Sequence, residues 1–217
     1  SNAVAFDLTA ACSGFLFALI TASQFLKGGN FKRAVVIGAD QLSSFVDWND
    51  RRSCILFGDG AGALAIEATN EFDNFIGFAM RTDGERGCFL NLPSKNSKDS
   101  IIDNIDFISG GFSPIQMNGQ EVYKFAVREV PIILKKLFRK TNFSSDQVDW
   151  LVLHQANQRI LDSVGDRLKI PKEKILSNLE KYGNTSAATI PLVMDEAIRN
   201  NRIKQNDIIA TSGFGAG

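Results

Sequence analysis

The hydrophobic and polar positions of the chain form short apolar runs, separated by longer stretches in which apolar residues recur every three or four positions. Short apolar runs are typical of buried strands, and the longer period is typical of helices. Residues 4–8 therefore predict a strand, and residues 14–27, apolar nearly all round, predict a buried helix that stops at Gly28. Residues 34–38 form a β-branched run without alternation, which predicts a strand covered on both faces.

A glycine-rich segment over residues 58–62 separates two further apolar runs, 54–57 and 63–67, and predicts a tight turn between two strands. Glycines also mark dinucleotide-binding loops, but those loops open a helix, and here a strand-like run follows. The pattern therefore favours close backbone packing over a nucleotide site. Residues 75–81 predict another strand.

The second half of the chain begins with a polar stretch, residues 93–113, that predicts an irregular connection. Residues 119–140 predict a long amphipathic helix that is kinked or broken at Pro131. The rest of the pattern predicts strands at 148–153 and 207–210 and helices at 155–168 and 187–200. We divide the chain into an N-terminal half, a connecting loop and a C-terminal half, with bounds 1–91, 92–118 and 119–217.

The two halves repeat one layout. Cys12 begins a helix that ends sixteen positions later at Gly28, and Asn184 precedes a helix that ends sixteen positions later at Asn200; a strand follows each helix. The match indicates a duplicated α/β unit with Cys12 and Asn184 at equivalent places. Chance similarity is the alternative, because helix–strand units are common in α/β folds.

Charge and composition exclude several classes of protein. The 24 basic and 24 acidic residues cancel, so no overall field favours nucleic acid or an anionic membrane surface. No apolar run is long enough to span a bilayer. The three cysteines are an odd number without metal-type spacing, which indicates a reducing, cytoplasmic setting.

Cys12 stands where the first predicted strand ends and a helix begins. Unpaired backbone N–H groups and the positive end of the helix dipole favour a thiolate there, so we expect a lowered pKa and a nucleophile. A small buried hydrophobe is the alternative, since most free cysteines are inert and buried.

Two further residues strengthen the catalytic interpretation. His154, the only histidine, stands at the end of a predicted parallel strand, where ligands bind in open α/β sheets; a structural role is the alternative. Asn184 lies in a glycine-containing turn. Cysteine and histidine supply a nucleophile and a proton carrier, and asparagine supplies a neutral donor for developing negative charge.

Five motifs occur in a fixed order: Asp7-Leu-Thr-Ala-Ala-Cys12-Ser-Gly-Phe, Phe57-Gly-Asp-Gly-Ala-Gly-Ala, His154-Gln-Ala-Asn157, Gly183-Asn184-Thr-Ser-Ala and Gly-Phe214-Gly-Ala-Gly. Together they resemble the β-ketoacyl-acyl-carrier-protein synthase III family, the initiating condensing enzymes of type II fatty acid synthesis. The resemblance implies a thiolase-like α/β fold, with duplicated halves and buried central helices between sheets. Asn184 stands where elongating ketosynthases carry histidine, and residues 213–217 lack the second cysteine of thiolases.

The resemblance implies a decarboxylative Claisen condensation of acetyl-CoA with malonyl-acyl carrier protein to acetoacetyl-acyl carrier protein. Cys12 would carry the acetyl group, and His154 and Asn184 would hydrogen-bond the malonyl thioester oxygen. Backbone N–H groups of Cys12 and Ala216 would form the oxyanion hole. No metal or other cofactor is implied beyond the CoA and phosphopantetheine thioesters.

The same resemblance assigns binding roles, each with an ordinary surface or packing role as the alternative. Phe57 would shape the acyl pocket. The residues that would contact CoA or phosphopantetheine are Arg51, Gly119, Tyr123, Ala156, Asn157 and Phe214, and those that would dock the acidic carrier protein are Lys124, Arg159 and Arg167.

Family members carry a segment before the nucleophile strand and a last strand after the glycine turn, and both are missing here. We therefore expect a fragment that is inactive alone. Family members are also homodimers, so a homodimer is expected. A related Cys-His-Asn enzyme of polyketide or other secondary metabolism, and a non-catalytic interaction module, are the alternatives; intact Cys12, His154 and Asn184 disfavour the second.

Overall fold

The computed structural model describes residues 3–69, 74–102 and 105–216. Its first part contains helix α1 (Gly14–Lys27) and two antiparallel strands, β1 (Arg33–Gln41) and β2 (Asp59–Glu67). The register of this pair runs from Arg33 opposite Glu67 to Gln41 opposite Asp59. The short elements of this part are the 3-10 turns η1 (Ala11–Ser13), η2 (Leu42–Phe45) and η3 (Gly84–Phe89) and the strand β3 (Leu90–Asn91), which pairs with β6 (Gln116–Met117).

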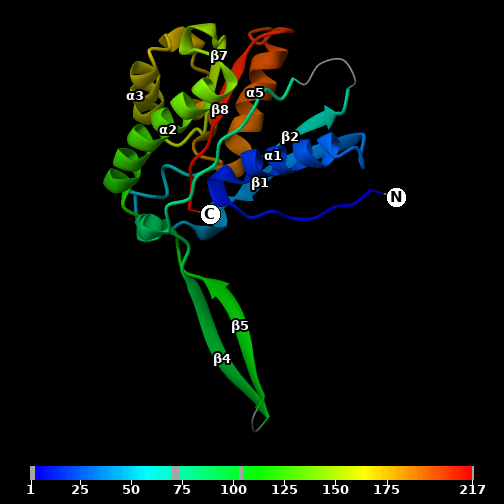
Figure 1. Ribbon diagram of the computed structural model, residues 1–217. Coiled ribbons are helices and arrows are strands. Elements are labelled where there is room, and N and C mark those ends of the chain that lie inside the picture. Colours follow the sequence, from blue (N-terminus) through cyan, green and yellow to red (C-terminus); the bar gives the residue numbers. More distant parts are fainter. Residues whose placement is uncertain (1–2, 70–73, 103–104, 217) are drawn as a thin grey trace.

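The last part is built on two parallel strands, β7 (Trp150–Leu153) and β8 (Ile209–Ser212). Helices lie around this pair (Figure 1). They are α2 (Gly119–Thr141), α3 (Gln158–Leu168), α4 (Leu179–Tyr182) and α5 (Thr189–Arg199), with the turns η4 (Ser145–Gln147), η5 (Lys172–Lys174) and η6 (Ser186–Ala188).

Two apolar cores hold these elements together. One lies between α2, α3 and β7 and includes Leu134, Leu151 and Leu161. The other joins residues from both halves. Its members include Phe15 of α1, Ile190 of α5, Val36 of β1 and Val152 of β7. Because this second core includes the first turns of α1 and α5, it brings the starts of the two helices together.

The predicted repeat of layout is present, but its register was wrong. The turn η1 leads into α1 as η6 leads into α5, and each turn begins with a non-glycine residue of positive φ, 43° at Ala11 and 52° at Ser186. Cys12 therefore corresponds to Ala187, three positions after Asn184. Counting from the helix ends gave the wrong match because α1 has 14 residues and α5 has 11.

Several predicted strands are absent from the described residues. Residues 4–8 and 75–81 form no regular secondary structure and belong to none of the described sheets. Residues 51–56 form turns, with Phe57 in a single bridge. A strand exists only where a second strand pairs its backbone groups, and apolar composition alone does not supply that partner.

The glycine-rich segment is not a turn between strands, because residues 59–62 lie within β2. A Cβ on Gly60 would lie 2.9 Å from Leu192 Cδ1, and one on Gly62 would lie 2.9 Å from Pro191 Cβ. These glycines therefore let α5 approach the strand closely. The predicted close packing is confirmed, and no helix opens on the glycines.

Residues 93–113 are not irregular: β4 (Ser94–Ile102) and β5 (Ile105–Phe112) form an antiparallel ribbon that projects from the rest of the chain (Figure 1). Polar composition concealed it, because a ribbon without a covering layer needs no apolar face. Residues 103–104 of this connection and Gly217 of the final glycine turn lie outside the described residues. The division of the chain into domains stays a prediction.

The predicted helices are confirmed in place, with shifted ends. The helix α2 continues through Pro131 and is not broken there, and α3 begins at Gln158 instead of Gln155. Strand β1 is confirmed but is not covered on both faces, since Val36 is buried while Val35 is 66% and Ile37 63% exposed. Only one face of the β1–β2 pair packs against described helices.

Replacing Gly38 by alanine is expected to destabilise the chain. A Cβ there would collide with the Ala187 carbonyl and lie 3.2 Å from Phe15 Cβ. Forced overpacking of this kind costs about 1–3 kcal/mol. Urea unfolding should show this loss for Gly38→Ala and a much smaller change for Gly84→Ala, because nothing lies within 4 Å of a Cβ at Gly84. Equal losses would contradict close packing at the joint between the halves.

Candidate active site

Cys12 lies in η1, at the joint between the two halves. Its side chain is only 9% exposed, and Ala11 before it has a positive φ of 43°. The glycine turn after β8 covers it closely, because a Cβ on Gly215 would lie 2.9 Å from both Cys12 Cβ and Cys12 N. The C-terminal end of the described chain and the start of α1 accordingly lie side by side (Figure 1).

The expected lowering of the Cys12 pKa is wrong for this structure. Burial raises the pKa of the thiol, and the carboxylate of Asp40 on β1 adds to the rise. A hydrogen bond from Ser186 opposes the rise but is outweighed. The effect of burial on the pKa of Cys12 therefore outweighs the lowering expected at a helix start. Cys12 needs a proton acceptor to react as a thiolate.

Asn184 is held by backbone pairing with Phe57. The Asn184 amide donates to Leu56 O at 2.8 Å, and the Gly58 amide donates to Asn184 O at 2.9 Å. Gly58 is required there, since a Cβ would collide with the Tyr182 carbonyl. The side-chain oxygen of Asn184 accepts from the Ser186 amide at 2.9 Å. That bond fixes the orientation of the side chain and leaves its NH₂ group to donate elsewhere.

His154 directly follows β7. Its amide donates to Ser212 O at 2.9 Å, which continues the parallel pairing of β7 with β8. The ring is 1% exposed, Nδ1 lies 2.8 Å from Thr189 Oγ1, and Phe214 meets the ring edge-on with centroids 5.2 Å apart. Burial lowers the pKa of His154 to about 4. The ring is therefore neutral near pH 7.

Ser186 connects the three expected catalytic residues. Its hydroxyl donates to Cys12 Sγ at 3.5 Å, its amide donates to Asn184 Oδ1, and its carbonyl accepts from Thr189 Oγ1 at 3.0 Å, whose hydroxyl touches His154. It does so with a φ of 52°, an uncommon conformation for serine. The sequence reading missed Ser186 and Thr189, although both lie within five residues of Asn184.

This arrangement gathers a thiol, a neutral imidazole and an oriented amide from three distant segments. Such a set can perform acyl transfer to sulfur, with proton exchange at imidazole and hydrogen bonding to an oxyanion.

The comparisons with known proteins indicate which family uses these groups. Profiles of the family described as 3-oxoacyl-[acyl-carrier-protein (ACP)] synthase III match residues 6–84, and profiles of its C-terminal part match residues 138–217, together more than half of the chain.

The chain belongs to the 3-oxoacyl-acyl-carrier-protein synthase III family.

Relatives and solved structures agree with this assignment. The β-ketoacyl-[acyl-carrier-protein] synthase III of Prochlorococcus marinus strain MIT 9312 is 92% identical over 216 residues, which make up 100% of this chain and 64% of that protein. A crystal structure of 3-oxoacyl-(acyl carrier protein) synthase III from Pseudomonas aeruginosa PAO1 is 30% identical, with a TM-score of 0.86 over 100% of this chain and 64% of that one.

A third likeness is to the priming β-ketosynthase of the R1128 polyketide pathway, which is 28% identical with a TM-score of 0.83 over 99% of this chain and 63% of that one. The predicted thiolase-like fold is confirmed by these structures. The chain spans about 64% of the length of the curated relatives it matches.

Only some of the residues that the synthase III resemblance assigns to binding lie near the three expected catalytic residues. Phe57 pairs with Asn184 and Phe214 contacts His154, while Ala156 donates its amide to the His154 carbonyl at 3.0 Å. Ala216 is exposed and follows Gly215, which packs on Cys12. These placements agree with roles beside the site but do not test them.

Other assigned residues lie on the surface or have partners of their own. Asn157 caps α3 by accepting from the Arg159 amide at 2.9 Å, and Tyr123 shares a hydrogen bond of 2.9 Å with Ser163. Lys124 pairs with Glu121 at 2.7 Å. Gly119, Arg159 and Arg167 are exposed on α2 and α3.

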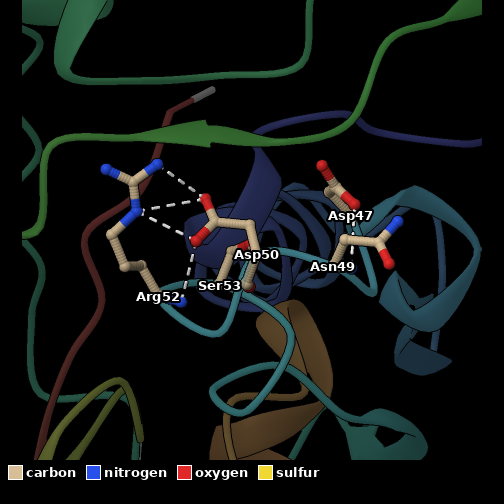
Figure 2. A network of polar contacts seen from close by, with 5 residues as sticks. All are labelled: Asp47, Asn49, Asp50, Arg52 and Ser53. Carbon is tan, nitrogen blue, oxygen red and sulfur yellow. Dashed lines mark hydrogen bonds and ion pairs between the residues drawn. The ribbon is translucent and has the colours of Figure 1, made fainter.

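Arg51 is exposed. Figure 2 shows the polar contacts that its sequence neighbours make. Its neighbour Arg52, and not Arg51, forms the ion pair with Asp50, at 2.9 Å, and Asp50 also accepts the Arg52 amide. Asp47 in the same segment accepts from the Asn49 amide at 2.9 Å. These bonds hold the segment in shape without using Arg51, whose binding role stays a prediction.

A cavity of about 980 Å³ lies between α1, α2 and residues 74–90. Ser13 and the final glycine turn border it, but Cys12, His154 and Asn184 are not among its lining residues. Within the described ranges, no group of three or more His, Cys, Asp or Glu side chains is placed to hold a metal ion. None of the helices that the structure describes has the length and apolar character to cross a membrane.

Replacing Ser186 by alanine is expected to raise the pKa of Cys12 further, because the hydroxyl lowers it. Alkylation of Cys12 near pH 8 should slow by about threefold to tenfold, the equivalent of one hydrogen bond. Mass spectrometry of the Cys12 peptide measures the rate separately from Cys54 and Cys88. Ser13→Ala is the control, since Ser13 adjoins Cys12 and makes no side-chain capping bond. Equal rates in both variants would exclude a role of the Ser186 hydroxyl.

The buried neutral ring of His154 is expected to make folding pH-dependent. Its pKa falls from 6.5 to about 4 on folding, so the unfolded chain binds the additional proton as the pH drops through 6.5. The stability that the neutral ring contributes should therefore be fully present above pH 7. The free energy of unfolding should fall by about 2 kcal/mol between pH 7 and pH 5. The measurement is urea unfolding at both pH values, and His154→Gln should lose this part of the pH dependence. An unchanged pH dependence in that variant would contradict the assignment.

Proposed function

We propose that this chain carries the catalytic residues of an initiating β-ketoacyl-acyl-carrier-protein synthase. The reaction is the decarboxylative Claisen condensation of acetyl-CoA with malonyl-acyl carrier protein, which gives acetoacetyl-acyl carrier protein and starts type II fatty acid synthesis. The observation that carries this proposal is the contact of Ser186 with Cys12, Asn184 and Thr189, the last of which touches His154. Family membership supports it.

The first half of the reaction moves the acetyl group to Cys12. The sulfur forms a bond to the acetyl carbon, the bond from that carbon to the CoA sulfur breaks, and the thiol proton leaves Cys12 for the departing CoA sulfur. The raised pKa of Cys12 makes a proton carrier necessary, and His154 is the neutral base that the site offers. The Cys12 and Ala216 amides would hold the oxyanion.

The second half needs no strong base, because loss of CO₂ from the malonyl group itself generates the carbanion. Asn184 is suited to hydrogen-bond the thioester oxygen, since its own oxygen is engaged by Ser186 and its NH₂ group is left to donate. His154 would be the second donor. The carbanion then attacks the acetyl carbon, and the Cys12 thiolate leaves and regains a proton.

A related condensing enzyme of polyketide metabolism is the second candidate. The observation that favours it is the likeness to a priming β-ketosynthase of a polyketide pathway. The two candidates differ in primer and carrier protein, so assays with several acyl-CoA primers and carriers separate them.

We further infer a cytoplasmic homodimer that uses acetyl-CoA and malonyl-acyl carrier protein and needs no metal. The exposed Val35 and Ile37 of β1 support association, because an apolar strand face of this kind is costly in water. Lys124, Arg159 and Arg167 offer exposed positive charge to an acidic carrier protein, although Lys124 also pairs with Glu121.

In the Prochlorococcus marinus MIT 9312 relative, which is 92% identical, acetyl-CoA is expected to acetylate the cysteine equivalent to Cys12, and malonyl-acyl carrier protein is expected to discharge the acetyl group as acetoacetyl product. Mass spectrometry of the Cys12 peptide and radiolabelled product formation measure the two steps. The same assays on this chain measure how much of the activity its own residues carry. Activity in the relative with none in this chain agrees with the expectation that these 217 residues are inactive alone.

Replacing the equivalent of Cys12 by serine should abolish acetylation, and replacing that of Asn184 by alanine should spare acetylation while slowing decarboxylation by about 10²-fold or more. A relative that condenses normally without this cysteine would overturn the proposal.

A further inference from the structure

Thr189 is the first residue of α5 and lies between His154 and Ser186. Its hydroxyl oxygen is 2.8 Å from His154 Nδ1 and 3.0 Å from the Ser186 carbonyl oxygen. Thr189 is 2% exposed and His154 1%. Both contacts are therefore shielded from water. Which atom donates and which accepts in each contact depends on the protons that the two side chains carry.

The number of protons available determines the direction of each hydrogen bond in this network. A carbonyl oxygen only accepts, and a hydroxyl has one proton to donate. Both contacts exist together only if the Thr189 hydroxyl donates to Ser186 O and Nδ1 of His154 donates to the Thr189 oxygen. The ring then carries its proton on Nδ1, and Nε2 has a free lone pair.

Two further observations agree with this arrangement. The Thr189 amide also donates to Ser186 O, which has a second lone pair for the hydroxyl. Burial keeps the ring neutral, so it carries only one proton to place. Among the described residues, no side chain or backbone group is hydrogen-bonded to Nε2.

We propose that Thr189 is a positioning residue that holds neutral His154 in the tautomer protonated at Nδ1, so that Nε2 presents a lone pair in the free protein. The sequence reading and the family resemblance assigned His154 a role without a tautomer and gave Thr189 no role.

The tautomer has a consequence that rests on the proposed condensation. As the Cys12 sulfur bonds to the acetyl carbon, Nε2 accepts the thiol proton and then gives it to the CoA sulfur, which leaves with the electrons of the broken C–S bond. Nδ1 keeps its proton throughout. Donation from Nε2 to the enolate oxygen requires the opposite tautomer, which the same hydroxyl stabilises if its proton turns from Ser186 O to Nδ1.

The experiment is nitrogen NMR of the chain labelled only in its histidine ring. His154 is the single histidine, so one pair of ring nitrogen signals reports the tautomer, provided that no histidine tag remains. At pH 7 we expect Nδ1 protonated and Nε2 unprotonated in the unsubstituted chain. The opposite pattern would overturn the proposal by itself, without any variant.

Three variants test the role of Thr189. Thr189→Val removes the hydroxyl at nearly constant volume and is expected to lose the Nδ1–H preference, whereas Thr189→Ser is expected to keep it. Thr189→Ala takes the place of the valine variant if that one does not fold, as judged by circular dichroism. A hydroxyl-free variant with an unchanged tautomer would exclude Thr189 as its cause.

A matched kinetic test uses the equivalent valine and serine variants of the 92% identical relative. The rate of acetyl transfer to the cysteine should fall about tenfold or more with valine and recover with serine. A valine variant that transfers acetyl at the normal rate would contradict the consequence for catalysis. Because the NMR measurement uses no substrate, the tautomer can be right while the proposed function is wrong, and the two failures are distinguishable.

Discussion

The close approach of the two 3-10 turns, η1 and η6, is the constraint on which the site depends. It requires a left-handed backbone at Ala11 and Ser186, a glycine at residue 38 so that β1 can pass the Ala187 carbonyl, and a glycine at residue 215 so that the final turn can cover Cys12. Left-handed non-glycine residues are strained and persist only where the surroundings hold them. Here the second apolar core supplies that support and places the cysteine beside the asparagine turn.

Burial at this joint determines the electrostatics of the site. It raises the pKa of Cys12 and lowers that of His154, so both side chains are neutral at physiological pH. A resting thiolate–imidazolium pair is thereby disfavoured. Neutral hydrogen-bonding groups suit the proposed condensation, in which loss of CO₂ creates the carbanion and no group must remove a proton from carbon. The same desolvation strengthens each hydrogen bond that Ser186 makes.

The sequence predicted well wherever a single segment determines its own structure. Residues 14–27 form the helix that their apolar residues and the following glycine predict, and Gly119–Thr141 forms the predicted long amphipathic helix. Prediction from the sequence failed for residues 4–8, 75–81 and 54–57, because a strand needs a partner that local composition does not specify. The ribbon of residues 94–112 was missed for the opposite reason, since its pairing needs no apolar pattern.

The sequence by itself determined the chemistry available to this protein. A cysteine at a helix start, a lone histidine after a strand and an asparagine in a glycine turn, each within its motif, identified the family and its three expected catalytic residues. Only the tertiary structure decided their protonation, the contacts of Ser186 and Thr189, and the register of the repeated halves. The physical reason is that desolvation and hydrogen bonding depend on which segments meet in space. Residues 12, 154 and 186 come from separate segments that pack around the core between the halves.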